Sequence, residues 1–355
     1  SNQILGTLSN LLKVEARQSY FFKNLKYLSW LKPLKEKCFF NPQNNPEPQE
    51  VPDQPGSYTI PHWNVLDYLE NVANKNLKEL QTEITDTLIE IIDSIINYRD
   101  EKGERIDNYR TDWVITKIIS TLPIEKIKDQ YIEFIRASLK SKWRSILVAC
   151  DIGKMVLPRL IEKKARALVL KLLDVMFDYE KKERQPYEEY KSIMDDYWLQ
   201  DALKKHTTNV IALCGLEAAN IAIKKIESLI SINDSHFKNM WIPTIDDNPQ
   251  NRHAGKYECQ LVHFVRDVFE QLGACQIKDT IKKLLAKDHP FFKRLAIHAI
   301  NHHYMELNEL FWNWNGNPLN ESSLKHELYE LLKNNCKTFS DKQIDKILDW
   351  IETKY

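Results

Sequence analysis

Apolar residues recur at helical spacing along most of this chain of 355 residues. In the range 84–96 they stand at positions i, i+4, i+7 and i+8, and the ranges 277–285 and 344–351 carry similar stripes. Such spacing places apolar side chains on one face of an amphipathic helix. Strict alternation of apolar and polar residues, which is typical of a half-buried strand, is hard to find. The sequence therefore predicts an all-α fold with essentially no sheet.

The glycine content supports the same prediction. Only 8 of the 355 residues are glycine, whereas proteins contain about 7% on average. The tight turns of all-β folds and the phosphate-binding loops of nucleotide-binding folds both depend on glycine. A chain so poor in glycine is better suited to helices joined by short turns.

Four prolines stand at the boundaries between the apolar stripes. Pro123, Pro158, Pro186 and Pro290 each precede a stretch of helical periodicity, and proline is tolerated in the first turn of a helix but not in its interior. We also interpret the charge run of mixed sign at 178–191 as a solvated helix face. We therefore expect the prolines to open helices over these ranges: 123–139, 158–177, 186–203 and 290–303.

A proline-rich segment interrupts this helical pattern near the N-terminus. Residues 42–61 contain six of the chain's 14 prolines, which favour extended backbone and lack the donor that a helix or strand needs. We expect residues 41–61 to form an extended strap, with Tyr58, Ile60 and Trp63 anchoring it along the helical surface. A disordered linker is the alternative interpretation.

The strap gives an expected division of the chain into three parts. Residues 1–40 are rich in aromatic side chains and are expected to form a helix pair. Residues 41–61 form the strap, and residues 62–355 form a helical-repeat domain with a long ordered loop at about 232–256.

Charge and cysteine content limit the environments in which such a chain works. Lysine plus arginine number 50 and aspartate plus glutamate number 50, so any binding to nucleic acid or an anionic membrane must use a local patch. The six cysteines include no C-x-x-C pair, which is typical of reduced intracellular thiols. No apolar run is long enough for a membrane span. We expect a cytoplasmic protein without membrane contact, and the Ser-Asn start suggests a fragment of a longer polypeptide.

The stretch 284–303 resembles the junction between the two helices of a HEAT repeat. Asp288, Pro290 and Arg294 stand at the turn and first helical positions of that pattern, and Ala296 and Ala299 follow at its small-residue positions. Asp288 is expected to cap the second helix, and the two alanines allow a neighbouring helix to approach closely. The resemblance implies an irregular HEAT/ARM-like α-solenoid of stacked antiparallel helix pairs. Weaker echoes of the pattern occur at these ranges: 108–123 and 141–158.

A second resemblance covers residues 20–42, 60–73 and 240–269. These segments look like parts of large bacterial proteins in which a nucleotide-binding domain is joined to a helical-repeat region, and some of those proteins are associated with defence against phage. The resemblance implies a sensor or regulatory region that binds a phage protein or nucleic acid. The chain itself carries no phosphate-binding glycine motif.

Two groups of residues have the spacing of metal ligands. His298 and His302 stand four apart on one expected helix, and Cys259 and His263 do the same with His253 in the loop before them. Helices offer zinc two ligands at this spacing, so a helical metal-dependent hydrolase around 246–263 is one alternative. A metalloprotease would need a glutamate where this chain has an alanine, and we favour ordinary, partly buried histidines.

The favoured interpretation is a non-catalytic scaffold that binds a protein partner without a cofactor. The sequence shows no catalytic motif, and helical repeats present long surfaces to partners. Polar side chains of the loop 246–253 suit a partner contact or a structural loop between repeats, and aromatic and arginine side chains are common anchors of interfaces. The candidate partner-binding residues are Trp113, Trp143, Arg144, Trp198, Asp246, Asp247 and Arg252.

Overall fold

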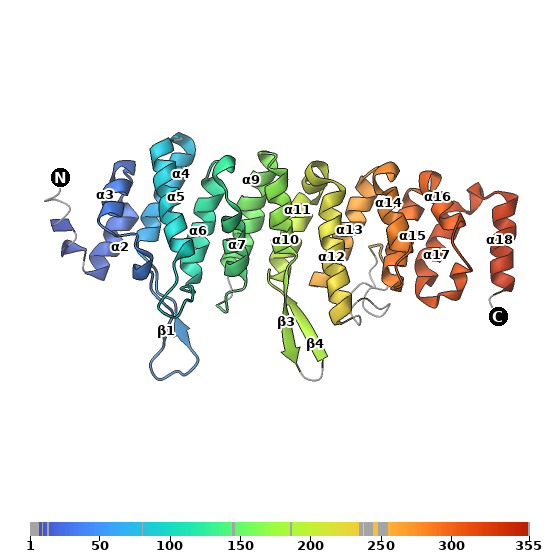
Figure 1. Cartoon of the computed structure of the whole chain (residues 1–355), viewed down its shortest axis with the longest axis horizontal. Coiled ribbons are helices and arrows are strands. Elements are labelled where there is room, and N and C mark those ends of the chain that lie inside the picture. The colour runs from blue at the N-terminus through green and yellow to red at the C-terminus, as the bar shows by residue number, and fades with distance from the viewer. Residues whose placement is uncertain are drawn as a thin grey trace. The chain divides into compact units, whose positions relative to one another are not determined.

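The structure is a computed structural model that divides into two compact units, Ser1–Ala165 and Arg166–Tyr355. Helices make up most of each unit (Figure 1), as the sequence predicts. The boundary lies inside the range 62–355 that was expected to form one repeat domain. The structure describes these residues: 7–8, 10–12, 14–79, 81–143, 146–184, 187–233, 237, 244–247 and 255–353.

Unit 1 consists of helices and one short hairpin. Its strands are β1 (Gln49–Glu50) and β2 (Tyr58–Thr59), and a 3-10 turn at Pro42–Asn44 precedes them. Its helices are α2 (Glu15–Asn24), α3 (Leu31–Glu36), α4 (Val65–Glu79), α5 (Thr82–Asn97), α6 (Tyr109–Thr121), α7 (Asp129–Leu139), α8 (Ile146–Asp151) and α9 (Leu157–Glu162).

The helices of unit 1 pack on neighbours that lie one or two places along the chain. Helix α4 contacts α2, α5 and α6, and α6 contacts α4, α7 and α8. The buried faces are the apolar stripes of the sequence, because Leu88, Ile91, Ile92 and Ile95 of α5 are all buried in the core of the unit. Apolar side chains removed from water in this way contribute about 25 cal/mol per Å² of area.

Ion pairs connect the exposed face of α5 to its neighbours on both sides. Its acidic side chains pair with lysines of α3 and of the segment before α7, and each exposed pair contributes at most about 1 kcal/mol. The pairs are Lys32–Glu83, Lys35–Glu90, Lys126–Asp86 and Lys128–Asp93.

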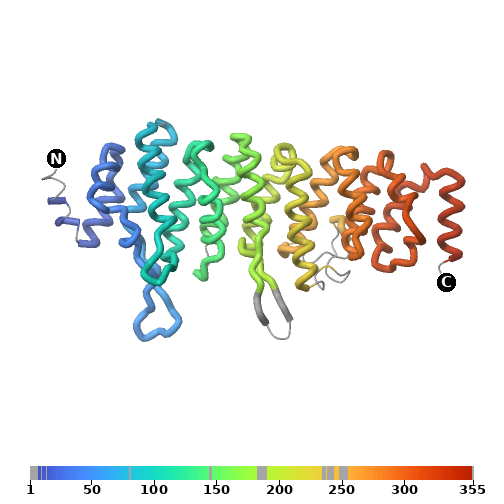
Figure 2. The backbone as a smooth tube through the Cα atoms, in the orientation of Figure 1, coloured from blue at the N-terminus to red at the C-terminus, as the bar shows by residue number. Residues whose placement is uncertain are grey.

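The segment 41–61 is held at its base by side chains of α6. Asn108 donates through Nδ2 to the carbonyl oxygens of Pro46 (2.9 Å) and Pro61 (3.0 Å), and Thr111 donates to Asn45 Oδ1 at 2.6 Å. Between these points the backbone forms the hairpin of β1 and β2, which extends beyond the ends of the neighbouring helices (Figure 2).

The side chains expected to anchor that segment differ in burial. Trp63 is buried in the core of unit 1, and Ile60 is partly buried. Tyr58 is exposed, although its ring lies 4.7 Å from the ring of Trp143.

Pro158 does not open a helix of its own. Helical backbone runs through 146–162, with a π-helical turn at Ile152–Val156 directly before Pro158. Widening the helix there accommodates a proline, which cannot donate the usual hydrogen bond. The expected helix 158–177 is therefore wrong: α9 ends at Glu162, and a new helix begins at Arg166.

The end of α9 explains this break. Lys164 has a left-handed backbone with φ of 54°. Its N–H donates to Ile161 O, and the next N–H donates to Leu160 O, the pattern of a Schellman motif. Glycine usually occupies this position, so a lysine there costs about 1 kcal/mol of strain.

Unit 2 contains a longer hairpin among its helices. Its strands are β3 (Tyr179–Arg184) and β4 (Tyr187–Ser192). Its helices are α10 (Arg166–Met176), α11 (Asp196–Cys214), α12 (Leu216–Ile232), α13 (Tyr257–Gln271), α14 (Ala274–Leu285), α15 (Pro290–His302), α16 (Tyr304–Trp312), α17 (Lys325–Asn335) and α18 (Asp341–Glu352).

The hairpin of β3 and β4 contradicts the prediction of a helix opened by Pro186. The strands pair antiparallel, with Glu180 opposite Lys191, so charges of opposite sign face each other across the ladder. The ring of Tyr190 packs near those of Tyr179 and Tyr257. Mixed charges suited both a helix face and a hairpin, and the tyrosines, which favour strands, decide the outcome through packing. The helix begins at Asp196 instead.

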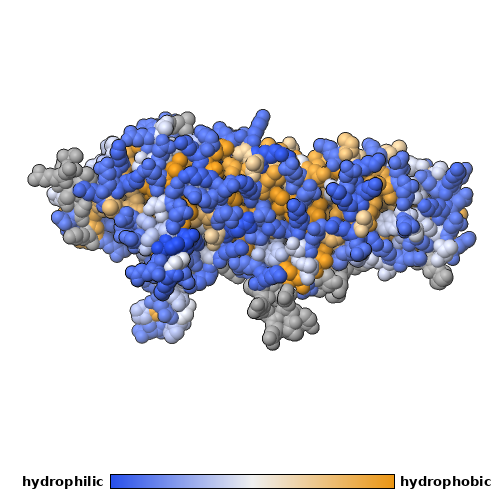
Figure 3. Space-filling view, viewed as in Figure 1, coloured by the Kyte–Doolittle hydropathy of each residue, from blue (hydrophilic) through white to orange (hydrophobic). Residues whose placement is uncertain are grey.

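The packing scheme of unit 2 matches that of unit 1. Helix α13 contacts α11, α12 and α15, and α15 contacts α13, α14, α16 and α17. On the face shown in Figure 3, hydrophilic side chains cover most of each unit, and hydrophobic patches lie among these side chains. Among the residues that the structure describes, no helix combines the length and apolar composition needed to span a lipid bilayer.

Helix α15 begins at Pro290, as predicted, but its cap differs from the expectation. His289 is the N-cap residue, and its Nδ1 accepts from the N–H of Phe291 at 3.3 Å. Asp288 was expected to cap this helix and instead is exposed. With Pro290 in the first helical position, residue 288 lies one position before the cap. Ala296 and Ala299 are fully buried.

Candidate functional site

The ionisable side chains of unit 2 converge where α13 passes the segment 244–247. Arg266 of α13 donates to the backbone oxygen of Ile245 at 3.2 Å and to the carboxylate of Asp247 at 2.8 Å. It also donates twice to Asp267 on its own helix, at 2.7 and 2.9 Å. Because four hydrogen bonds occupy the guanidinium, Arg266 fixes the segment to α13.

A buried ion pair holds the same segment from the other side. Arg294 of α15 and Glu327 of α17 form a bidentate pair at 2.8 and 2.9 Å, and their side chains are 1% and 2% exposed. Glu327 also accepts from the backbone N–H of Ile245 at 3.3 Å. Two charges buried this completely are stable only because they pair with each other and form hydrogen bonds.

His298 of α15 completes this clamp on residues 244–247. Its Nδ1 lies 3.1 Å from Asp246, and its Nε2 lies 2.8 Å from Glu270 of α13. Both ring nitrogens face carboxylates, so both must donate, which requires the charged imidazolium. Although burial opposes the charge, the two carboxylates raise the pKa of His298 to about 9. Hydrogen bonds from His298 in turn lower the pKa values of Asp246 and Glu270.

A polar depression of about 460 Å³ borders the clamp, between α11 and α13. Asp247, Arg266 and Asp267 stand on its clamp side. Burial raises the pKa of Asp267 despite the neighbouring Arg266, whereas the hydrogen bond from Arg266 lowers that of Asp247. The remaining lining side chains are Gln200, Leu203, Lys204, Thr207, Thr208, Gln260, His263, Phe264 and Gln271.

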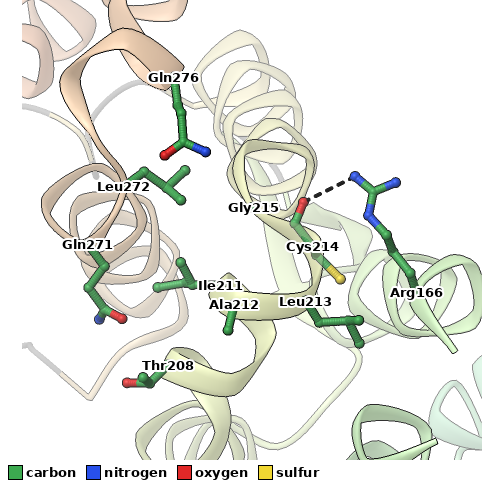
Figure 4. A pocket seen from close by; sticks show the side chains of 10 residues that line it. All are labelled: Arg166, Thr208, Ile211, Ala212, Leu213, Cys214, Gly215, Gln271, Leu272 and Gln276. Carbon is green, nitrogen blue, oxygen red and sulfur yellow. Dashed lines mark hydrogen bonds between the residues drawn. The ribbon is translucent and has the colours of Figure 1, made fainter. Parts of the chain in front are cut away.

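A second depression, of about 410 Å³, continues along the same helices. It shares Thr208 and Gln271 with the first, and it ends near Arg166, whose guanidinium donates to the Cys214 carbonyl at 3.4 Å (Figure 4). Ile211 and Leu272 supply apolar lining, and Ala212 is exposed at the surface. We call the two joined depressions the α11 groove.

The uncharged lining of the α11 groove is rich in amides. Gln200 and Gln271 are exposed and make no side-chain hydrogen bond within the described part of the chain. Gln260 lies beneath them, and its amide nitrogen donates to Asp196 O and Gly255 O, while its buried oxygen has no hydrogen-bond partner among the described residues. An amide offers both donors and acceptors, so the groove suits a ligand that carries both.

Cys259 and His263 lie one turn apart on α13, as their spacing predicts, but neither is activated. Burial, followed by the charge of Glu258, raises the pKa of the Cys259 thiol to about 12, so it stays protonated at neutral pH. Burial and Arg266 lower the pKa of His263 to about 4, which keeps the imidazole neutral.

The two histidines of α15 do not share a position from which to hold an ion. His298 is committed to its two carboxylates, while His302 is exposed with its ring 4.7 Å from that of His303. In the ranges that the structure describes, no group of three or more histidine, cysteine, aspartate or glutamate side chains has the arrangement of a metal site. His253 lies outside those ranges, as do Arg144 and Arg252.

The tryptophans suggested as partner anchors occupy three different places. Trp113 of unit 1 donates to Asp151 at 2.7 Å, and the ammonium of Lys117 lies 3.8 Å from its ring. Trp143 packs against Tyr58. Trp198 of unit 2 is half-buried beside Tyr197. Each is engaged in intramolecular packing, and none lines the α11 groove.

The sequence points to Asp246, Asp247, His263 and His298, but no pattern in it identifies the groups that hold them in place. Those groups are Arg266, Glu270 and Glu327. The signal for Arg266 was local: it stands between Val265 and Val268 in a helix whose apolar residues surround it. A charge in that position needs a partner, although only the fold identifies which one.

No protein-family model matches the sequence, and a search of curated proteins finds no significant match. Function is therefore inferred from the geometry of the α11 groove and its surroundings.

Proposed function

We propose that this chain is a non-catalytic helical-repeat scaffold that binds a protein partner along the α11 groove. Each unit is an irregular HEAT-like stack of antiparallel helix pairs. The packing of several helices on their next-but-one neighbours, such as α4 on α6 and α13 on α15, supports this assignment, because repeat proteins bury their apolar faces between successive units in that way.

The state of the ionisable groups favours binding over catalysis. The charges beside the groove are neutralised by one another, as in Arg266 with Asp247 and Asp267. The thiol and imidazole of α13 have pKa values displaced away from those of a nucleophile and a base that act at neutral pH. Such a surface recognises a ligand by hydrogen bonds and shape.

The dimensions of the groove indicate an extended peptide segment. Gln200, Lys204, Thr208 and Ala212 form a row of exposed side chains along α11, and twelve helical residues span about 18 Å. An extended peptide rises about 3.3 Å per residue, so five or six residues fill this length. The amides of Gln200 and Gln271, which make no hydrogen bond within the described ranges, match the alternating donors and acceptors of peptide backbone.

The continuity of the two depressions at Thr208 carries this proposal. The experiment selects binders from a phage-displayed library of random 12-residue peptides on the intact chain and measures their affinity by fluorescence anisotropy. Thr208→Trp fills the groove, so we expect binding at least tenfold weaker, which corresponds to about 1.4 kcal/mol.

Asn209→Trp is the matched control, because Asn209 is exposed on the same helix but does not line the groove. Its affinity for the peptides should stay within twofold of wild type. Selection that yields no binder, or binders that tolerate both substitutions equally, would refute the proposal.

A further inference from the structure

Helix α18 carries a stripe of exposed aliphatic side chains. Ile344, Leu348 and Ile351 are 43%, 52% and 52% exposed. At 100° per residue they fall within about 60° of one another on the helix surface. Three aliphatic side chains at i, i+4 and i+7 form the pattern by which one amphipathic helix anchors on another.

The helix is fixed from its opposite side. Trp350 is buried, with its ring 5.8 Å from that of Phe311 and stacked at 6.1 Å on Trp312 of α16. Lys346 donates to the Trp312 carbonyl at 2.7 Å. A capping box at Ser340 and Gln343 closes the N-terminus of α18. The aliphatic stripe is therefore presented on a helix that is already ordered.

One flank of the stripe is acidic. Asp341, Asp345 and Glu352 lie about 60–100° to one side of Ile344 around the helix. All three are exposed, and none forms an ion pair within the described residues. Of the lysines of α18, Lys346 donates to the Trp312 carbonyl, and Lys342 forms no ion pair with these acids within the described residues.

The charge pattern argues against an antiparallel pair of α18 helices from two copies. Such a pair sets equivalent flanks against each other, so the acids would face acids. Like charges across a helix pair are destabilising.

We propose that the aliphatic stripe of α18 docks an amphipathic helix of a partner protein whose own aliphatic stripe is flanked by lysine or arginine. The basic flank of the partner helix pairs with Asp341, Asp345 and Glu352 of α18. The aliphatic side chains of the partner helix cover Ile344, Leu348 and Ile351. The interface is short, about 18 Å along the helix, so the complex belongs to the weak, transient class. This proposal stands independently of the α11 groove.

The experiment uses two synthetic 18-residue helical peptides with the same leucine stripe, one flanked by lysine and the other by glutamate. Their binding to the intact chain is measured by fluorescence anisotropy at low and high salt. We expect the lysine-flanked peptide to bind at least tenfold more tightly, with an affinity that falls as salt is added, because screening weakens exposed charge pairs.

Three variants locate the binding site. Leu348→Glu should weaken binding of the lysine-flanked peptide at least tenfold. Met305→Glu, which replaces an exposed apolar residue on α16, should leave that binding unchanged. The double variant Asp345→Lys/Glu352→Lys should reverse the preference in favour of the glutamate-flanked peptide.

Several results would overturn the proposal. These are the absence of peptide binding, equal binding of both peptides, and a charge-reversal variant that keeps the wild-type preference. Dimerisation in sedimentation runs, or binding to phosphatidylcholine vesicles, that Leu348→Glu abolishes would assign the stripe to a second copy or to a lipid surface instead.

Discussion

Replacing His298 with glutamine tests whether the charged imidazole stabilises unit 2. The substitution keeps a side chain that can donate a hydrogen bond but removes the charge between Asp246 and Glu270. The pKa of His298 is about 9 in the folded protein against an ordinary value of 6.5. Each pKa unit corresponds to about 1.4 kcal/mol, so at pH 7 the charge contributes on the order of 2–3 kcal/mol. The side chain is only 7% exposed, so solvent screening reduces this little.

The pH dependence follows from the direction of the pKa change. A raised pKa stabilises the folded state fully below the unfolded value near 6.5, and the contribution is lost as pH rises through about 9. Between pH 7 and pH 10, the free energy of unfolding of wild type should therefore fall by on the order of 2–3 kcal/mol more than that of His298→Gln. At low pH the loss comes instead from Asp246 and Glu270, whose pKa values are lowered, as each becomes protonated.

Urea denaturation followed by circular dichroism at pH 7 and pH 10 measures both effects. His302→Gln, on the same helix but exposed, is the control and should change the free energy of unfolding by less than about 0.5 kcal/mol. A loss below about 1 kcal/mol for His298→Gln at pH 7, or parallel losses in wild type and variant between the two pH values, would show that the imidazole is not a buried cation.

Two further substitutions test the structure elsewhere. Glu327→Ala removes the carboxylate that pairs with the buried guanidinium of Arg294, so we expect the free energy of unfolding to fall by about 3–5 kcal/mol. Urea denaturation measures this, and a loss below about 1 kcal/mol would contradict the burial of the pair. Lys164→Gly relieves the left-handed backbone at the end of α9 and should stabilise unit 1 by about 0.5–1 kcal/mol, seen as a higher midpoint in thermal unfolding; a lower midpoint would show that Lys164 is not strained.

The helical core follows closely from the apolar pattern. The stripe at 84–96 is the buried face of α5, and the stripe at 277–285 is that of α14. These predictions succeed because the 3.6-residue period is a local property of the chain. The stripe at 344–351 has the same period, yet much of it is exposed, since periodicity identifies an amphipathic helix without identifying what covers it.

The errors lie where local patterns fit two structures. The charged, tyrosine-rich segment 178–191 suited a helix face but forms β3 and β4, because Tyr190 packs near Tyr257 from a distant part of the chain. Pro158 was expected to open a helix, and a π-helical turn instead carries the helix through it. The helix expected from Pro123 begins only at Asp129. At the fourth proline boundary, Pro290, the helix begins as predicted and only the capping residue differs.

For the candidate site, the sequence identifies which ionisable residues are present, and the fold determines which of them interact. The spacing of Cys259 and His263 correctly indicates that they lie one turn apart on a helix, but their pKa values depend on burial. His298 meets Asp246 and Glu270 only because α15, α13 and the segment 244–247 come together. Arg294 of α15 likewise pairs with Glu327 of α17 because these two helices pack together.

The sequence by itself therefore determined that this chain is helical and which faces of its helices are apolar, since these depend on residues within a few turns of one another. Tertiary structure decided which charges pair, which helix face stays exposed on α18, and where depressions form along α11. Those properties arise from contacts between residues far apart in the chain, and electrostatic energies depend on burial and distance that no local pattern encodes.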